Sequence, residues 1–212
     1  MQSSDISSNA PRIRRTPIRL VMLASGAGTT VSAFCEAGEK GQIPAQVVAV
    51  ITNESKAGVI SVAEEHQVPC SVIQYQKENV MNWDQLLLKT IKKYDPDLIL
   101  LAGFLKKIGP VVLSHFKNRI VNSHPALLPE FSGLGMYGSR VHTAVIAHKK
   151  TETGVTIHLV NENYDEGRIL AQRKLPVFPK ETPSELEKRV KTMEKDLYIQ
   201  TVKKILSGDI SL

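Results

Sequence analysis

The chain has 212 residues, which is enough for one domain with a sizeable hydrophobic core. Its formal net charge is +6, but the lysines are scattered without interleaved aromatic residues, so the charge favours small anionic substrates over nucleic acid. No run of about eighteen apolar residues occurs, so we expect no membrane-spanning helix. The two cysteines make no disulfide framework and favour a reducing, cytoplasmic environment.

The first sixteen residues are rich in serine and arginine and contain no apolar run. We expect residues 1–16 to form a disordered tail, and Asp5 argues against a targeting leader. Residues 17–212 then form a single domain.

Strand-like and helix-like segments alternate through the first half of the chain. A near-continuous apolar run at residues 18–24 is typical of a buried parallel strand. Further strands are predicted at 45–52, 68–73 and 97–102, and helices from Val31, at 55–67 with Ser55 as cap, and at 82–94. The order predicts an α/β fold with a doubly wound, mostly parallel sheet flanked by helices.

A glycine-rich turn separates the first strand from the first helix. Its sequence is Ser25-Gly26-Ala27-Gly28-Thr29-Thr30. Glycines after a strand let backbone N–H groups approach an anion at a helix N-terminus, and the threonine hydroxyls add donors. The turn therefore indicates a phosphate site, although Gly-x-Gly alone also fits an ordinary strand-to-helix turn.

The strongest chemical pattern is Asn122-Ser123-His124-Pro125, which follows the apolar residues Ile120 and Val121. Side chains two apart on a strand share a face, so an amide and an imidazole converge at this strand end. Asp165, in a turn after the alternating strand at 154–160, is the candidate third member. These residues suit oxyanion stabilisation and proton handling, while a capping histidine and a turn aspartate remain the plain structural alternative.

The second half is predicted to end in two antiparallel strands and a long helix. Residues 131–150 form a glycine-rich loop and a short helix, and the alternation at 154–160 places His158 beside the site as a structural histidine. Residues 167–177 form the last strand, antiparallel to its predecessor. Thr182, Pro183 and Glu185 mark a helix start with a capping box, and Glu194 lies beside its apolar stripe.

The motif Asn-x-His-Pro-x-Leu-Leu-Pro from Asn122, followed by Gly-Val-Thr-x-His and the turn at Asp165, resembles the folate-dependent formyltransferases. The resemblance runs from about residue 18 to 206, and length and order match the members that formylate glycinamide ribonucleotide in purine synthesis. It implies a Rossmann-like fold, with a nucleotide-binding N-terminal half and a folate-binding C-terminal half. It also implies 10-formyltetrahydrofolate as formyl donor, no metal, and a monomer or homodimer.

The resemblance also implies residue roles. Asn122, His124 and Asp165 are catalytic, and His124 is expected to have a pKa above about 6.5 because of Asp165. The remaining implied residues are Gly26, Gly28, Thr29, Thr30 and Glu194 for the phosphate and ribose of the acceptor, and Leu105, Lys106, Lys107, Ile108, Asn122 and Val160 for folate.

The chain departs from the family pattern at several positions. Thr30 lacks the usual amide, Lys106 replaces arginine, and Tyr137 stands in a lengthened loop where many members carry histidine. A usual folate-contacting arginine is also missing, which leaves open whether Lys77 substitutes for it. Three alternatives stay open: a formyltetrahydrofolate hydrolase, a formyltransferase with another amine acceptor, and a non-catalytic binding module.

Overall fold

The computed structural model describes residues 16–212, so the predicted tail lies, except for Thr16, outside the described residues. One seven-stranded sheet forms the centre, in the order β3-β2-β1-β4-β5-β6-β7. The strands are β1 (Ile18–Leu23), β2 (Ala45–Thr52), β3 (Cys70–Val72), β4 (Leu98–Leu101), β5 (Ile120–His124), β6 (Glu152–Leu159) and β7 (Ile169–Pro176). The helices are α1 (Thr29–Glu39), α2 (Val59–Glu65), α3 (Val80–Lys92), α4 (Pro110–His115), α5 (Ser139–Ala147) and α6 (Pro183–Ser207), with a 3₁₀ turn at Lys77–Asn79.

The sheet is parallel from β3 to β5 and antiparallel beyond it. β6 runs antiparallel to β5, and β7 runs antiparallel to β6. The predicted doubly wound, mostly parallel sheet with an antiparallel pair toward the C-terminus is therefore confirmed, and the antiparallel part also includes the β5–β6 pairing.

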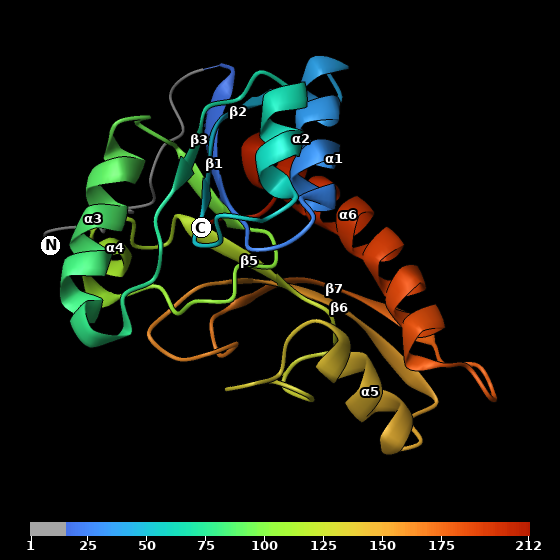
Figure 1. Ribbon diagram of the computed structural model, residues 1–212. Helices are drawn as coiled ribbons and strands as arrows, with labels where there is room; N and C mark the ends of the chain where they lie inside the picture. Colours follow the sequence, from blue (N-terminus) through green and yellow to red (C-terminus); the bar gives the residue numbers. More distant parts are fainter. Residues whose placement is uncertain (1–15) are drawn as a thin grey trace, which may run out of the picture.

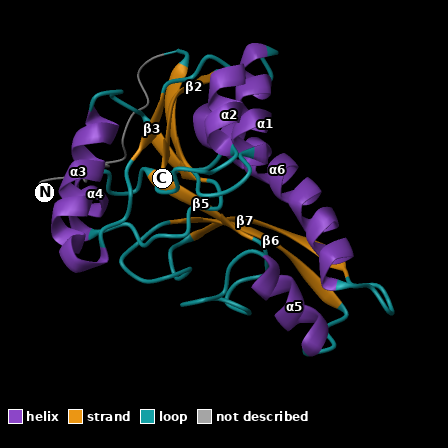
Figure 2. Cartoon of the chain, viewed as in Figure 1, coloured by secondary structure: helices purple, strands orange, loops and turns teal. Residues whose placement is uncertain are grey.

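Two hydrophobic clusters lie on opposite faces of the sheet. Helices α1, α2 and α6 cover one face and α3 and α4 cover the other, as Figure 1 shows. The strands lie between these helical layers in Figure 2. Buried side chains alternate between the clusters along the central strands: Leu20 and Met22 of β1 face one layer, and Val21 and Leu23 face the other. Among residues 16–212, no helix has both the length and the hydropathy needed to cross a membrane.

Local signals predicted some element ends and missed others. The Thr182 hydroxyl accepts the Glu185 amide and the Glu185 carboxylate accepts the Thr182 amide, so the predicted capping box is present. The predicted Ser55 cap is wrong, because α2 begins at Val59. The Val59 amide donates to the carbonyl of Gly26 at 3.0 Å, so a tertiary contact sets this helix start.

Candidate active site

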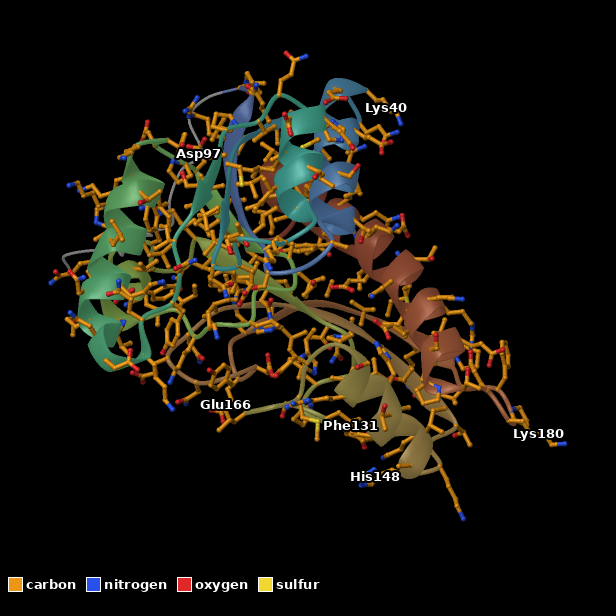
Figure 3. The ribbon with its side chains drawn as sticks, viewed as in Figure 1. Lys40, Asp97, Phe131, His148, Glu166 and Lys180 are labelled. Atoms are coloured by element: carbon orange, nitrogen blue, oxygen red, sulfur yellow. The ribbon has the colours of Figure 1, made fainter. Side chains whose placement is uncertain are left out.

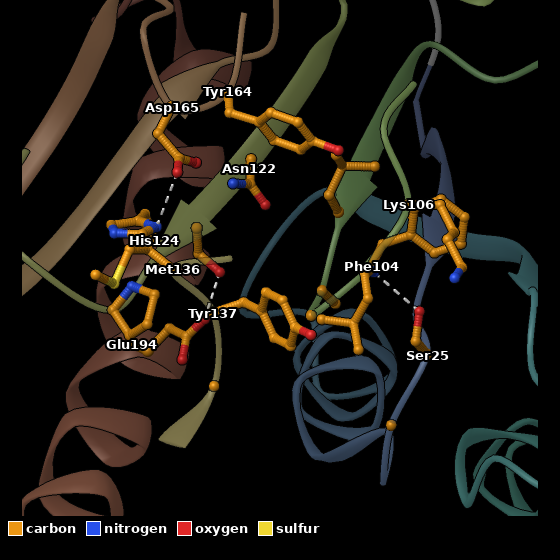
Figure 4. Close-up of a pocket in the computed structure, with 18 of the residues that line it drawn as sticks. Ser25, Phe104, Lys106, Asn122, His124, Met136, Tyr137, Tyr164, Asp165 and Glu194 are labelled. Carbon is orange, nitrogen blue, oxygen red and sulfur yellow. Dashed lines mark hydrogen bonds and ion pairs between the residues drawn. The ribbon is translucent and has the colours of Figure 1, made fainter. Parts of the chain in front are cut away.

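One cavity of about 600 Å³ lies beside the carboxyl ends of β1, β4 and β5. Its wall includes the glycine-rich loop, the loop after β4, the end of β5 and the turn between β6 and β7. Open α/β sheets bind ligands at this edge, and the volume lies within the usual range for small-molecule sites. Figure 4 shows Ser25, Phe104 and Lys106 toward one end and Asn122, His124 and Asp165 toward the other.

The glycine-rich loop has the geometry of an anion cradle. Gly28 has φ of 81°, and α1 begins directly after it at Thr29, two residues earlier than predicted. Among residues 16–212 no side chain caps α1, so the first amides of the helix are open toward an anion. Ser25 braces the loop, since its hydroxyl donates to Asn53 at 2.6 Å and accepts the Leu105 amide at 3.0 Å.

The end of β5 brings the three predicted catalytic residues together. Nδ1 of His124 lies 3.6 Å from Oδ2 of Asp165, and this pair is drawn in Figure 4. Asp165 Oδ2 also accepts the Gly133 amide at 3.0 Å, which ties the β6–β7 turn to the loop before α5. His124 and the Asp165 side chain are both nearly buried, so water screens their interaction little.

His124 is fixed through its second ring nitrogen. Nε2 lies 2.9 Å from the carbonyl oxygen of Phe131, so Nε2 carries a proton and donates it. Nδ1, on the Asp165 side, is therefore the nitrogen that gains or loses a proton. The Phe131 ring in turn packs edge-on against His148 at the end of α5, beside which Figure 3 shows both residues.

The expected upward shift of the His124 pKa is wrong for the protein without substrates. Burial in the site lowers the pKa below its usual 6.5, and this outweighs the charge of Asp165 and the Phe131 carbonyl, which both raise it. The imidazole is consequently mostly neutral at pH 7 before ligands enter.

His158 positions the amide of Asn122. The Asn122 Nδ2 group donates to His158 Nε2 at 3.0 Å, while His158 Nδ1 donates to the carbonyl of Leu159 at 2.9 Å. Burial lowers the pKa of His158, which keeps the ring neutral and able to accept that bond. The second N–H of Asn122 remains for a ligand. This agrees with the structural role predicted for His158.

Helices α5 and α6 contribute polar residues to the cavity wall, of which only Glu194 was predicted. The Glu194 carboxylate accepts a hydrogen bond from the hydroxyl of Ser123, a motif residue without a predicted role. His142 is 1% exposed, lines the same cavity, and has no partner at Nδ1 among the described residues. Lys191 also lines this wall and pairs with Glu187 one helical turn away at 2.6 Å.

The residues expected to contact folate all line the cavity, and four of the six lie in the loop after β4. Lys106 lies over the ring of Tyr75 at 4.8 Å, and Lys107 lies over the ring of Tyr164 at 5.5 Å. All of them belong to the cavity wall: Leu105, Lys106, Lys107, Ile108, Asn122 and Val160. Lys77 is not among the lining residues.

An anion cradle and an amide–imidazole–carboxylate set that share one cavity define an α/β enzyme for small-molecule substrates. The sequence model of the formyl transferase family matches residues 18–202. The chain belongs to the formyl transferase family.

Curated relatives and solved structures agree with this assignment. The chain is 39% identical over 185 residues to the chloroplastic phosphoribosylglycinamide formyltransferase of Vigna unguiculata, covering 87% of this chain and 59% of that protein. It is 32% identical over 195 residues to the phosphoribosylglycinamide formyltransferase of Haemophilus influenzae, covering 92% and 90%. The chain therefore spans less than two thirds of the plant relative and nearly all of the bacterial one.

Among solved structures, glycinamide ribonucleotide transformylase 1 from Symbiobacterium toebii has a TM-score of 0.83 at 30% identity, covering 90% of this chain and 88% of that one. A formyltetrahydrofolate deformylase from Pseudomonas syringae has a TM-score of 0.82 at 18% identity, covering 90% and 62%. The second likeness shows the fold alone.

Proposed function

We propose that the protein transfers the formyl group of 10-formyltetrahydrofolate to the amine of glycinamide ribonucleotide in purine biosynthesis. The observation that carries the proposal is the single cavity that joins the cradle at Gly28 to the set of Asn122, His124 and Asp165. An acceptor bound by its phosphate at the cradle extends its amine toward the catalytic end, where the formyl donor enters from the side of Leu105 and Val160. The names of the relatives point to the same reaction.

The chain's residues divide into two substrate groups. Gly26, Gly28, Thr29 and Thr30 bind the acceptor phosphate through amide and hydroxyl donors, and Glu194 accepts from the ribose. Apolar side chains and backbone groups from residues 105–108, with Asn122 and Val160, hold the folate. Lysines 106 and 107 add positive charge near the anionic donor.

The reaction needs charge stabilisation and one proton relay. The acceptor amine attacks the formyl carbon, the carbonyl electrons move to oxygen, and the new C–N bond leaves the attacking nitrogen positively charged. Asn122 donates an N–H to the oxyanion, and Nδ1 of His124 takes up the proton that the positively charged attacking nitrogen releases. Asp165 stabilises the imidazolium, which then gives that proton to the folate nitrogen as the C–N bond to the donor breaks and the carbonyl re-forms.

The test is formyl transfer by the purified protein with and without glycinamide ribonucleotide. We expect folate product only when the acceptor is present, and His124→Ala lowers kcat by about 10²–10⁴-fold. His115→Ala, an exposed histidine of α4 outside the cavity, is the matched control. Near-normal turnover of His124→Ala would refute the catalytic assignment.

The same assay separates the alternatives. Donor consumption without any acceptor indicates a formyltetrahydrofolate hydrolase. Binding of both ligands without turnover indicates a non-catalytic module, and product from another amine indicates a different acceptor. The cytoplasmic location and the monomer or homodimer state stay predictions.

A further inference from the structure

Ser123 lies between the two predicted catalytic residues of β5 but points to the other side of the strand. Successive strand residues face opposite ways, so Asn122 and His124 share one side and Ser123 faces α6. Ser123 is 7% exposed, and its hydroxyl donates to Oε1 of Glu194, the interaction drawn at Glu194 in Figure 4. This hydrogen bond thus connects β5 to the part of the cavity wall that α6 forms.

Within the described part of the chain, one oxygen of the Glu194 carboxylate is hydrogen-bonded and the other is not. Oε1 accepts from Ser123, while Oε2 has no hydrogen-bond partner among the described residues and Glu194 lines the cavity. An ionised carboxylate accepts hydrogen bonds and donates none, so its natural ligand here is a hydroxyl or N–H group. A sugar bound by its phosphate at the anion cradle presents such hydroxyls.

The hydrogen bond from Ser123 affects the protonation state of Glu194. Burial raises the pKa of Glu194, while the Ser123 hydroxyl, Lys191 and Lys195 lower it in that order. Tyr198 of α6 feels the same charge, since Glu194 contributes to its raised pKa after burial. His142 of α5 lies on the same cavity wall. Ser123 therefore favours the ionised form of Glu194, which accepts hydrogen bonds, whereas burial favours the protonated form.

We propose that Ser123 is a positioning residue, which orients Glu194 so that its free oxygen accepts hydroxyl groups of the acceptor's sugar. The proposal rests on the proposed function and deepens it by explaining how one strand serves both the chemistry and acceptor selection. Asn122 and His124 act on the reacting carbon from one side of β5. From the other side, Ser123 fixes the contact between Glu194 and the sugar of the amine substrate.

The kinetic test compares Ser123→Ala, Ser123→Thr, Glu194→Gln and the Ser123→Ala/Glu194→Gln double variant. A lost hydrogen bond to a charged group predicts that Ser123→Ala raises the KM for glycinamide ribonucleotide about 10- to 100-fold. The kcat and the KM for the formyl donor stay within about twofold, because both catalytic residues remain in place. Ser123→Thr keeps the donor and restores the acceptor KM.

The pH profile gives a readout that loss of packing alone would not move. Removing the Ser123 hydroxyl raises the Glu194 pKa further, so Glu194 becomes protonated at a higher pH as the solution is acidified. The acid limb of kcat/KM for the acceptor therefore moves to higher pH in Ser123→Ala. In the Glu194→Gln background, Ser123→Ala no longer shifts the acid limb. There it changes the KM for glycinamide ribonucleotide by less than about twofold.

Equal losses in kcat and in both KM values, an unmoved acid limb, or additive effects in the double variant would overturn the proposal. If Ser123→Ala does not fold, Glu194→Gln alone decides, since an unchanged acceptor KM would sink the idea. If the wild type transfers no formyl group to glycinamide ribonucleotide, the proposed function fails separately. Equilibrium binding of ribose 5-phosphate, weakened by Ser123→Ala and Glu194→Gln non-additively, then still supports the positioning role, and additive or absent weakening overturns it.

Discussion

Gly28 offers a sharp test of the anion cradle, because both its backbone conformation and its contact with Val59 disfavour a side chain at this position. Its φ of 81° lies in the left-handed region, and an added Cβ would stand 2.8 Å from Cα and 2.9 Å from Cγ2 of Val59. The left-handed conformation costs a residue with a side chain about 1–2 kcal/mol. Displacing the Val59 backbone adds about 1–3 kcal/mol, as overpacking does. The stiffer unfolded chain offsets about 0.4–1 kcal/mol.

We therefore expect Gly28→Ala to lower the free energy of unfolding by about 1–5 kcal/mol in urea titrations. Gly41→Ala is the matched control, since Gly41 has φ of 65° but nothing within 4 Å of an added Cβ. It isolates the conformational cost, about 0–1.6 kcal/mol after the unfolded-state offset. Because the loop must shift away from Val59, Gly28→Ala should also raise the acceptor KM at least about tenfold while leaving the donor KM unchanged.

Two results would contradict this reasoning. Equal stability of Gly28→Ala and Gly41→Ala would mean that the loop yields to an added Cβ without cost. A lowered stability with an unchanged acceptor KM would mean that the loop is a structural turn and that the acceptor phosphate binds elsewhere in the cavity.

Three further perturbations test individual contacts in the structure. Asp165→Asn removes the charge that raises the His124 pKa and leaves burial, which lowers it, so the acid limb of kcat/KM, along which the neutral ring of the free protein becomes protonated, moves to lower pH; an unmoved limb would show no electrostatic coupling. Tyr198→Phe removes a buried bond to the Val121 carbonyl at 2.8 Å and should cost about 1–2 kcal/mol in urea unfolding; a cost near zero would mean water replaces it. Thr182→Ala removes half of a capping box and should cost about 1 kcal/mol by the same measurement, with kinetics unchanged.

The elements that could be predicted from the sequence are those whose causes are local. The strand β2 is predicted with its observed ends, Ala45–Thr52, because a mostly apolar run between Pro44 and the turn at Asn53 marks both ends. The start of α6 was predicted because Thr182 and Glu185 bond each other's backbone. The start of α2 was not, because its first amide bonds Gly26 of a distant loop. The helix α4 was also missed, although Pro110 at its first turn is a recognised start signal.

The candidate site divides in the same way. The spacing of Asn122 and His124 placed both on one side of a strand, and the turn at Asp165 comes to the same place because β6 pairs with β5. The carbonyl of Phe131 at His124 and the bond from Ser123 to Glu194 depend on chain segments whose approach no local pattern encodes. Sequence motifs thus identify the reacting groups more readily than the groups that hold them.

The His124 pKa shows why this difference matters for mechanism. A motif supplies the identity of the charged neighbour and hence the sign of its contribution, but burial depends on everything packed around the ring. Here burial prevails in the protein without substrates, so the imidazole rests neutral with its proton on Nε2 toward Phe131. When an oxyanion forms nearby, its charge adds to that of Asp165 and favours protonation at Nδ1. A neutral resting ring can therefore accept a proton at the moment when negative charge appears, which a permanently protonated imidazolium could not do.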